Sequence, residues 1–193
     1  MCPRGRYVGR GGEKLQVAIE RLGLDLEGVV AADFGCNIGG FTDCLLQHGA
    51  RRVYAVDTGY GMLDWKLRRD ERVVVMERTN AMHVELPEQV GLVTVDVGWT
   101  RQQHILPNAL RQSAPDGTIL SLFKPQYEAA DELVRGGRIL EGTFDEILDA
   151  SLSELEGMGI AVSRVIRLPQ ERESKNPEAF LYIRADRCER EDT

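Results

Sequence analysis

The sequence has no long apolar stretch. No run of roughly 18 or more apolar residues occurs in it, so we expect no transmembrane helix. Arg4, Arg6 and Arg10 near the start are not followed by the apolar segment that a secretory signal requires. The four cysteines form no Cys-x-x-Cys pair and the three histidines are scattered along the chain. We therefore expect no metal site and a reduced, cytoplasmic protein.

Basic residues are in the minority, because 24 lysines and arginines face 31 aspartates and glutamates, giving a net charge of −7. This deficit argues against a large nucleic-acid-binding surface. The cations are nevertheless grouped: Arg4, Arg6, Arg10 and Lys14 lie near the start, and Lys66, Arg68, Arg69 and Arg72 follow later. We favour a phosphate-binding role for the first group and an ordinary solvated face for the second.

One glycine-rich stretch, DFGCNIGGFTD at residues 33–43, organises the chain. An apolar run at residues 29–32 leads into Asp33, the glycines follow, and a helical apolar pattern begins at Phe41. The next apolar strand, residues 52–56, ends in Asp57, where a carboxylate is placed to bind ribose hydroxyls. The combination predicts a site for a nucleoside-type cofactor. A tight turn in an α/β domain without a ligand is the alternative.

The rest of the chain alternates between helical and strand patterns. We expect helices over residues 11–23, 40–49, 62–69, from 105 to a turn at 115–117, and 143–158, with further strands at 73–76, 92–97, 118–123, 160–168 and 180–183. This order predicts one α/β domain over residues 1–193, with a parallel sheet, helices on both faces and an antiparallel final strand. We expect an irregular, basic segment at 1–9, a mobile surface loop at 125–141 and a C-terminal tail at 185–193.

Charged side chains fall where α/β proteins build their sites, at the carboxyl ends of strands. Asp33 and Asp57 end the first two strands, Asp96 closes the fourth, and Lys124 follows the fifth. Asp96 and Lys124 would lie on neighbouring strands, so we expect them to pair. A surface ion pair without function is the alternative interpretation of each residue taken alone.

Several motifs, in order along the chain, carry a resemblance to a known family. They are RGGEK at 10–14, GGFTDCLLQ at 39–47, VYAVDTGYGMLDWKLR at 53–68, ERTNA at 77–81, TVDV at 94–97 and FKPQYE at 123–128. They resemble the FtsJ-type ribosomal RNA methyltransferases, most closely the TlyA (hemolysin A) group. The resemblance extends from about residue 7 to residue 183. It implies a Rossmann-like class I methyltransferase fold, with a seven-stranded, mostly parallel sheet and helices on both faces.

The resemblance also implies S-adenosylmethionine as methyl donor and the ribose 2′-hydroxyl of RNA, specifically ribosomal RNA, as acceptor. The family's catalytic Lys-Asp-Lys-Glu tetrad falls on Lys14, Asp96, Lys124 and Glu178. Cofactor-binding positions fall on Asp33, Gly35, Cys36, Asn37, Gly39, Gly40, Phe41, Asp57, Asn80 and Asp96. Among them, Asp33 and the glycine loop are expected at the methionine end, Asp57 at the ribose and Asn80 at the adenine. A plain turn role is the alternative for Asn80.

The sequence departs from the family in places that concern the acceptor. An N-terminal RNA-binding domain, typical of the TlyA group, is not contained in these residues, so we expect a partner to be able to supply one. Small hydroxyl residues are replaced by Cys36 and Asn37, and the segments 98–101 and 171–177 also differ from the family pattern. Trp99 in the first of these segments is either a base-stacking platform or a core residue. A small-molecule O-methyltransferase and a non-catalytic, RNA-associated cofactor-binding module therefore remain alternatives.

Overall fold

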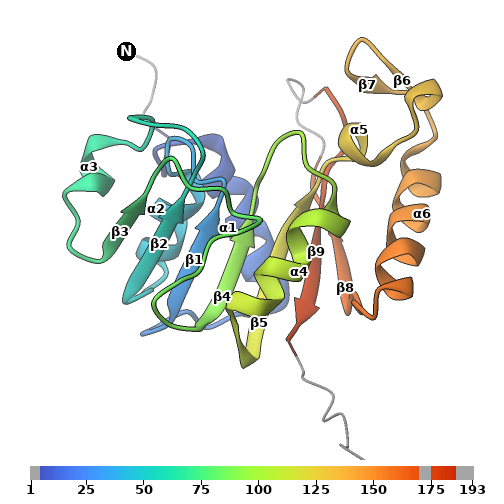
Figure 1. Cartoon of the computed structure of the whole chain (residues 1–193). Helices are drawn as coiled ribbons and strands as arrows, with labels where there is room; N and C mark the ends of the chain where they lie inside the picture. Colours follow the sequence, from blue (N-terminus) through green and yellow to red (C-terminus); the bar gives the residue numbers. More distant parts are fainter. Residues whose placement is uncertain (1–4, 170–174, 186–193) are drawn as a thin grey trace, which may run out of the picture.

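The structure, a computed structural model, describes residues 5–169 and 175–185. The helices are α1 Arg10–Leu22, α2 Gly40–Gln47, α3 Trp65–Arg68, α4 Gln102–Gln112, α5 Pro125–Glu128, the 3-10 turn η1 Asp131–Leu133, and α6 Phe144–Gly157. The strands are β1 Val30–Phe34, β2 Arg52–Val56, β3 Val73–Met76, β4 Val90–Val95, β5 Ser113–Phe123, β6 Val134–Arg135, β7 Arg138–Ile139, β8 Arg164–Arg167 and β9 Ala179–Arg184. Within the described residues, helices lie between most successive strands of the main sheet, but none lies between β3 and β4 or between β8 and β9 (Figure 1).

The main sheet has seven strands in the order β3-β2-β1-β4-β5-β9-β8. The five strands from β3 to β5 are parallel, whereas β9 runs antiparallel to both of its neighbours, β5 and β8. The predicted class I methyltransferase architecture with an antiparallel final strand is therefore confirmed. Strand order reverses at β1, between β2 and β4, and this is where α/β sheets place their ligands, outside the carboxyl ends of the strands.

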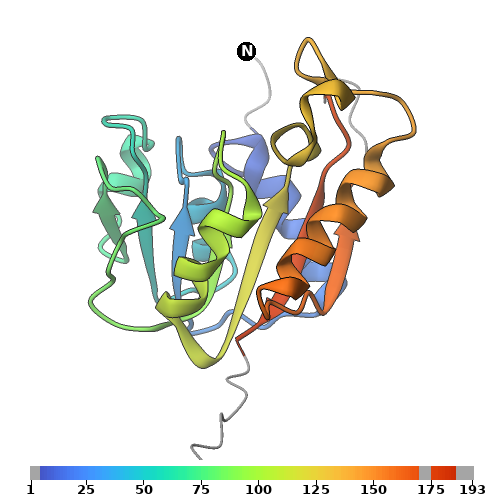
Figure 2. The ribbon, with the colours of Figure 1, turned by 45° about the vertical axis from the view of Figure 1, so that its right-hand side comes forward.

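Helices cover both faces of the sheet and bury two apolar clusters (Figure 2). Leu15 and Ile19 of α1 pack with Leu45 of α2 on one face. Ile105 of α4 and Leu155 of α6 belong to the cluster on the other face. The central strand β1 is buried along its whole length, which explains its uninterrupted apolar pattern around Asp33. Gly23 ends α1 in the left-handed conformation (φ 63°), as its sequence position predicts.

Three expected elements differ in the structure. Residues 125–141, expected as a mobile loop, instead form α5, η1 and the hairpin β6–β7. The expected strand at 160–168 is limited to Arg164–Arg167, because Ile160 turns back onto the end of α6 and its N–H bonds to the Leu155 carbonyl at 2.9 Å. Strand β5 begins at Ser113, which pairs with Val90, so the turn expected at 115–117 lies within the strand.

Two further findings concern the thiols and the membrane. Cys36 and Cys44 are buried, free thiols, while Cys2 and Cys188 lie outside the described residues. Within residues 5–169 and 175–185, no helix combines the length and apolarity that a bilayer-crossing helix needs.

Candidate active site

Two adjoining cavities lie at the carboxyl ends of the central strands. The larger has a volume of about 450 Å³ and the smaller about 300 Å³, and Gly35, Asn37 and Asp96 line both. The larger is also lined by Gly9, Arg10, Gly11, Lys14, Cys36, Ile38, Gly40, Phe41, Gln126, Lys175, Asn176 and Glu178. The smaller is also lined by Asp57, Thr58, Thr79, Asn80, Ala81, Met82, Val97, Gly98, Trp99, Thr100 and Ile105. The arrangement is a two-part cleft joined at the β1–α2 turn.

Gly35 brings the β1–α2 turn close to β4. Its φ is 86°, and a Cβ atom added there would lie 2.6 Å from the carbonyl oxygen of Asp96. Only glycine fits this combination of left-handed backbone and close approach. Gly35 therefore keeps the turn and Asp96 in contact at the point where the two cavities join.

Two residues expected at the cofactor line neither cavity. Gly39 begins α2 with a φ of 97°, and an added Cβ would meet the Leu67 side chain at 2.2 Å, so its role is to shape the turn. Asp33 is fully buried beneath the turn. Both residues support the β1–α2 turn from the side away from the cavities. A sequence pattern alone does not distinguish such support from direct contact with a ligand.

Asp33 fixes the start of α2. Its Oδ2 accepts hydrogen bonds from the Thr42 backbone N–H at 2.9 Å and from the Thr42 hydroxyl at 2.7 Å. Its Oδ1 lies 3.2 Å from the Thr94 hydroxyl on β4. Burial raises the pKa of Asp33 to about 7, against the opposing effect of the Thr42 hydrogen bond, and the nearby Asp96 charge raises it further. Asp33 therefore joins β1, β4 and α2 and acts as a positioning residue.

Asp57 is held rigidly at the smaller cavity. Its Oδ2 accepts a hydrogen bond from the Asn37 N–H at 2.8 Å, and its Oδ1 accepts one from the Gly59 N–H at 2.7 Å. A carboxylate oxygen accepts more than one hydrogen bond, so Asp57 retains capacity for ribose hydroxyls. Asn80 lines the same cavity while its Oδ1 accepts from the Met82 N–H at 2.9 Å, so it both shapes a turn and borders the cleft.

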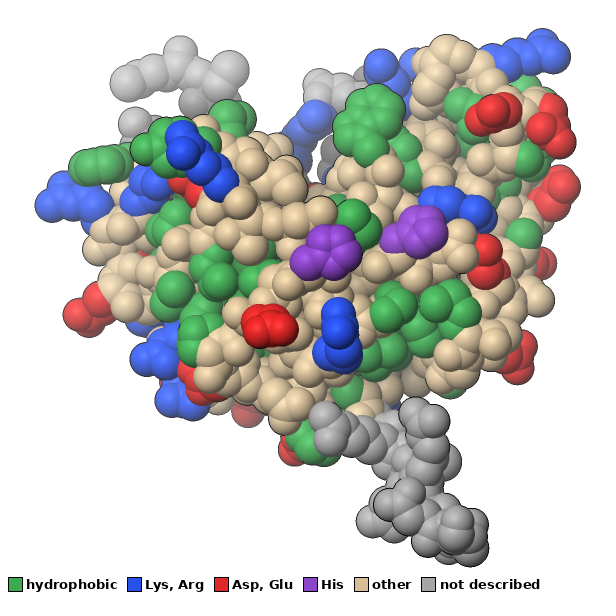
Figure 3. Space-filling model, viewed as in Figure 1, with side chains coloured by type: hydrophobic (Ala, Val, Ile, Leu, Met, Phe, Trp, Pro, Cys, Tyr) green, Lys and Arg blue, Asp and Glu red, His purple; other side chains and the backbone are tan. Residues whose placement is uncertain are grey.

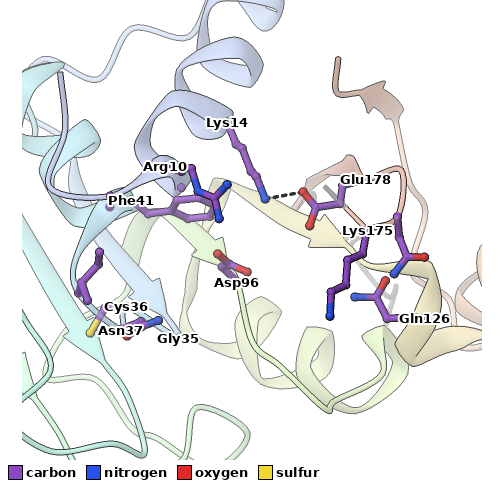
Figure 4. Close-up of a pocket in the computed structure, with 15 residues that line it drawn as sticks. Arg10, Lys14, Gly35, Cys36, Asn37, Phe41, Asp96, Gln126, Lys175 and Glu178 are labelled. Carbon is purple, nitrogen blue, oxygen red and sulfur yellow. Dashed lines mark ion pairs between the residues drawn. The ribbon is translucent and has the colours of Figure 1, made fainter. Parts of the chain in front are cut away.

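Two lysine–carboxylate pairs stand at or next to the larger cavity, and Figure 4 shows the first of them, Lys14–Glu178. The Nζ atom of Lys14, on α1, lies 2.5 Å from Oε2 of Glu178. Lys124, at the end of β5, forms an ion pair with Asp96 and lies 3.4 Å from the Val97 carbonyl oxygen. The structure thus brings together four residues that are far apart in the sequence. Lys14, Asp96 and Glu178 line the cavity, and Lys124 reaches it through Asp96.

The structure adds cavity residues that the sequence analysis did not single out, among them Lys175 and Asn176. The Asn176 side chain accepts a hydrogen bond from the Ile139 N–H at 2.9 Å and donates one to the Gly137 carbonyl at 2.9 Å. It therefore ties the β6–β7 hairpin to the segment that carries Glu178. Asn176 was missed in the sequence analysis because residues 125–141, which Asn176 holds in place, were expected to be a mobile loop.

Trp99 projects from the rim of the smaller cavity. It is 90 % exposed, so core packing is wrong for this residue, and its backbone is left-handed (φ 62°). Its ring lies 5.4 Å from the ring of Tyr127. The loop behind it is anchored by buried Glu128, whose Oε1 accepts from the Gln102 N–H at 2.9 Å and whose pKa burial raises to about 7. Trp99 is thus presented to solvent by an ordered support.

The described residues contain no group of three or more histidine, cysteine, aspartate or glutamate side chains arranged to hold a metal ion.

Comparison with known proteins agrees with this geometry. The family model described as "FtsJ-like methyltransferase" matches residues 7–185. The Bacillus subtilis "Putative rRNA methyltransferase YqxC" is 44 % identical over 136 residues, covering 67 % of this chain and 47 % of that protein. The Mycobacterium tuberculosis "16S/23S rRNA (cytidine-2'-O)-methyltransferase TlyA" is 40 % identical over 138 residues, covering 69 % and 51 %. The chain thus spans about half the length of these curated relatives.

Solved structures extend the comparison. A crystal structure described as a "putative hemolysin from Lactococcus lactis" superposes with a TM-score of 0.87 at 34 % identity, covering 94 % of this chain and 90 % of that one. Solved S-adenosylmethionine-dependent methyltransferases of 17 % and 15 % identity share the fold alone, with TM-scores of 0.62 and 0.65. Fold, site geometry and sequence agree, and the chain belongs to the FtsJ-like methyltransferase family.

Proposed function

We propose that this protein transfers a methyl group from S-adenosylmethionine to the 2′-hydroxyl of an RNA ribose, in ribosomal RNA. The observation that carries the proposal is the pairing of Lys124 with Asp96 and of Lys14 with Glu178 beside the joined cavities. The relatives YqxC and TlyA, which are both named as rRNA methyltransferases, support the choice of acceptor. An enzyme acting on ribosomal RNA would work in the cytoplasm.

The residues of the cleft fit the cofactor. Gly35 leaves open the space that a Cβ atom would fill beside Asp96, so a ligand can approach the backbone closely. The backbone at 35–37, Gly40 and Phe41 would hold the methionine end, Asp57 the ribose hydroxyls, and Asn80 the adenine. The cofactor, when bound, supplies a methyl group activated by the positive sulfur. Everything else in the reaction falls to the side chains of this protein.

A ribose hydroxyl is a poor nucleophile, so it must lose its proton as its oxygen bonds to the methyl carbon and the sulfur–carbon bond breaks. Lys124 in its neutral form would accept that proton, since a base has to lie within hydrogen-bond reach of the group it deprotonates. Asp96 would orient Lys124, and the Lys14–Glu178 pair would place a second cation beside the acceptor oxygen. Much of the rate enhancement would come from holding the hydroxyl in line with the methyl group.

A small-molecule acceptor is the second candidate, favoured by the net charge of −7. Donor labelled in its methyl group, incubated with total RNA or with a metabolite extract, separates the two. We expect label in RNA, and none when Lys124 is replaced by alanine. Label in the metabolite fraction alone would support the second candidate. A non-catalytic, RNA-associated module would transfer no label to either fraction while still binding the cofactor.

Asp57→Ala should weaken cofactor binding by about 1–3 kcal/mol, the scale of a lost charged hydrogen bond. The reason is that Asp57 is a carboxylate lining the smaller cavity and is already oriented by two backbone N–H groups. Calorimetric titration with S-adenosylmethionine measures the change. A thermal melt shows whether the turn itself has moved, and Asp57→Asn serves as the isosteric comparison. If Asp57→Ala bound S-adenosylmethionine as tightly as wild type does, the ribose of the cofactor would have to bind at another residue.

If the acceptor is RNA, activity should fall as salt concentration rises, because phosphate contacts release counterions. Replacing Arg6 and Arg10 by glutamine should flatten the dependence of activity on salt, since both residues are exposed and Arg10 lines the larger cavity. Arg4 of the same basic group lies outside the described residues. Arg164→Gln, on the edge strand β8, is the matched control. Activity insensitive to salt and to both substitutions would speak for a small-molecule acceptor.

A further inference from the structure

An exposed aromatic surface borders the cofactor cleft on the side of α3. Tyr60 and Trp65 are each 69 % exposed and Met62 is 52 % exposed. Soluble proteins rarely leave two aromatic rings and a methionine exposed within six residues of chain unless they bind something. Figure 3 shows hydrophobic and basic side chains lying side by side at the upper left, over this region.

Cations interleave with these rings. The Arg78 guanidinium lies 4.2 Å from the centroid of the Tyr60 ring, and Lys66 and Arg69 flank Trp65 on and after α3. We call Tyr60, Met62, Trp65, Lys66, Arg69 and Arg78 the α3 surface. Among the described residues, Arg69 and Arg78 have no carboxylate partner, because the nearby acids are engaged elsewhere. Glu77 pairs with Arg68, and Asp70 pairs with Arg72.

The fold joins this surface to the basic N-terminal segment. Asp43, buried on α2, accepts a hydrogen bond from the Val8 N–H at 2.9 Å and pairs with Lys66 at 3.1 Å. The two groups of cations that are separate in the sequence therefore lie next to each other, with Arg6 and Arg10 on one side and the α3 surface on the other. Together they form a strip that is locally basic and aromatic, although the net charge of the protein is −7.

The α3 surface also reaches both cavities. The Ile38 carbonyl accepts from the Asp64 N–H at 3.1 Å, and Ile38 lines the larger cavity. Thr58 and Thr79, adjacent in the chain to the loops that carry Tyr60 and Arg78, line the smaller one. A polymer bound on the strip would thus continue directly into the cleft.

We propose that the α3 surface binds a single-stranded RNA segment next to the acceptor nucleotide, an inference that rests on the proposed function. Exposed aromatic rings can stack on bases while cations contact phosphates, and proteins that bind single-stranded nucleic acids combine these two kinds of contact. Paired bases in a duplex present no free faces to Tyr60 and Trp65. Trp99 lies on the rim of the smaller cavity beside Tyr127 and is not part of this surface.

The chain has two tryptophans, so Trp99→Phe leaves Trp65 as the single reporter of fluorescence. A mixed-sequence, single-stranded RNA of about 12 nucleotides should quench Trp65, and the same sequence as a duplex should quench it much less. Tyr60→Ser with Trp65→Ser, measured by anisotropy of labelled RNA, should weaken binding by about tenfold or more. Met158, at the end of α6, is also an exposed apolar residue, so Met158→Ser is the control and should bind RNA as wild type does.

An unquenched Trp65, together with unchanged RNA affinity in the double serine variant, would overturn the inference and assign the apolar surface to a protein partner. This failure is distinct from failure of the proposed function. If RNA receives label while Trp65 stays silent, methylation stands and the surface assignment falls. If Trp65 is quenched while RNA receives no label, the surface assignment stands and the 2′-O-methylation proposal falls.

Discussion

Lys124→Ala should lower the rate of methyl transfer by about 10²–10⁴-fold, the usual contribution of a general base. Lys124 is the lysine paired with Asp96, which lines both cavities, and in its neutral form it would receive the hydroxyl proton, so its replacement removes the proposed base. Cofactor affinity should stay near that of wild type, because Asp57 and the glycine turn are untouched. Single-turnover rates with labelled donor and calorimetry on the same preparation measure the two quantities.

Arginine at position 124 discriminates between two roles for the lysine. Lys124→Arg keeps a positive charge beside Asp96 but does not deprotonate. If the residue is the base, this variant should be as inactive as Lys124→Ala. An active arginine variant would show that the charge only positions the acceptor. Lys124→Met keeps most of the side-chain volume, so a loss of activity shared by all three variants cannot be attributed to a cavity left by alanine.

Asp33→Asn should leave cofactor affinity nearly unchanged and make the protein more stable at neutral and alkaline pH. The amide oxygen can accept both hydrogen bonds from Thr42, and the amide nitrogen can donate to the Thr94 hydroxyl. That hydroxyl lies 3.3 Å from the Ala32 carbonyl and can donate there in turn. The substitution therefore keeps the network and removes a buried charge, which is costly to desolvate.

The sign of the pH dependence follows from the raised pKa of Asp33. Its pKa rises on folding from 3.8 to about 7, so its contribution to stability is complete below about pH 4 and is lost as pH rises to about 7. The loss relative to the asparagine variant amounts to about 4 kcal/mol, from about 1.4 kcal/mol per pKa unit. Urea unfolding of wild type and Asp33→Asn between pH 4 and pH 8 measures the difference in their free energies of unfolding. The other titratable groups are common to both proteins, so their contributions cancel in this difference.

A constant difference in stability across that range would mean that Asp33 stays ionised in the fold. Asp33→Ala provides the contrast, because it leaves the Thr42 N–H and hydroxyl buried without their acceptor. It should destabilise the protein at every pH, by about 1–3 kcal/mol for each unpaired group. If Asp33→Asn instead lost much of its cofactor affinity while keeping its stability, Asp33 would contact the cofactor directly, as expected from the sequence.

The sequence predicted the part of the fold that local patterns determine. The apolar runs of β1 and β2 and the glycines around α2 specify buried strands and a tight turn, because periodicity and backbone freedom are local properties. The hairpin at 134–139 was missed because its fixed position depends on Asn176, more than 30 residues away. Its two-residue strands and adjacent glycines have the sequence pattern of a loop, and the pattern does not include the contact with Asn176.

The same limit applies to the candidate site. In the sequence, Asp33 and Asp57 each follow an apolar run, yet Asp33 lies within β1 opposite Ala55 and is buried, whereas Asp57 follows β2 and borders the cleft. Trp99 likewise could not be assigned from its residue type, since its exposure depends on the support of the loop by Glu128. Which side of a turn a residue faces is set by tertiary packing, and the linear pattern does not contain it.

The most direct test of the account is the position of the transferred methyl group. Unmodified ribosomal RNA or ribosomal subunits would be incubated with the protein and S-adenosylmethionine, digested to nucleosides and separated by mass spectrometry. The account predicts a nucleoside whose added methyl is on the ribose, absent with Lys124→Ala. A methyl group on the base, or no methylated nucleoside from a protein that binds the cofactor, would contradict it.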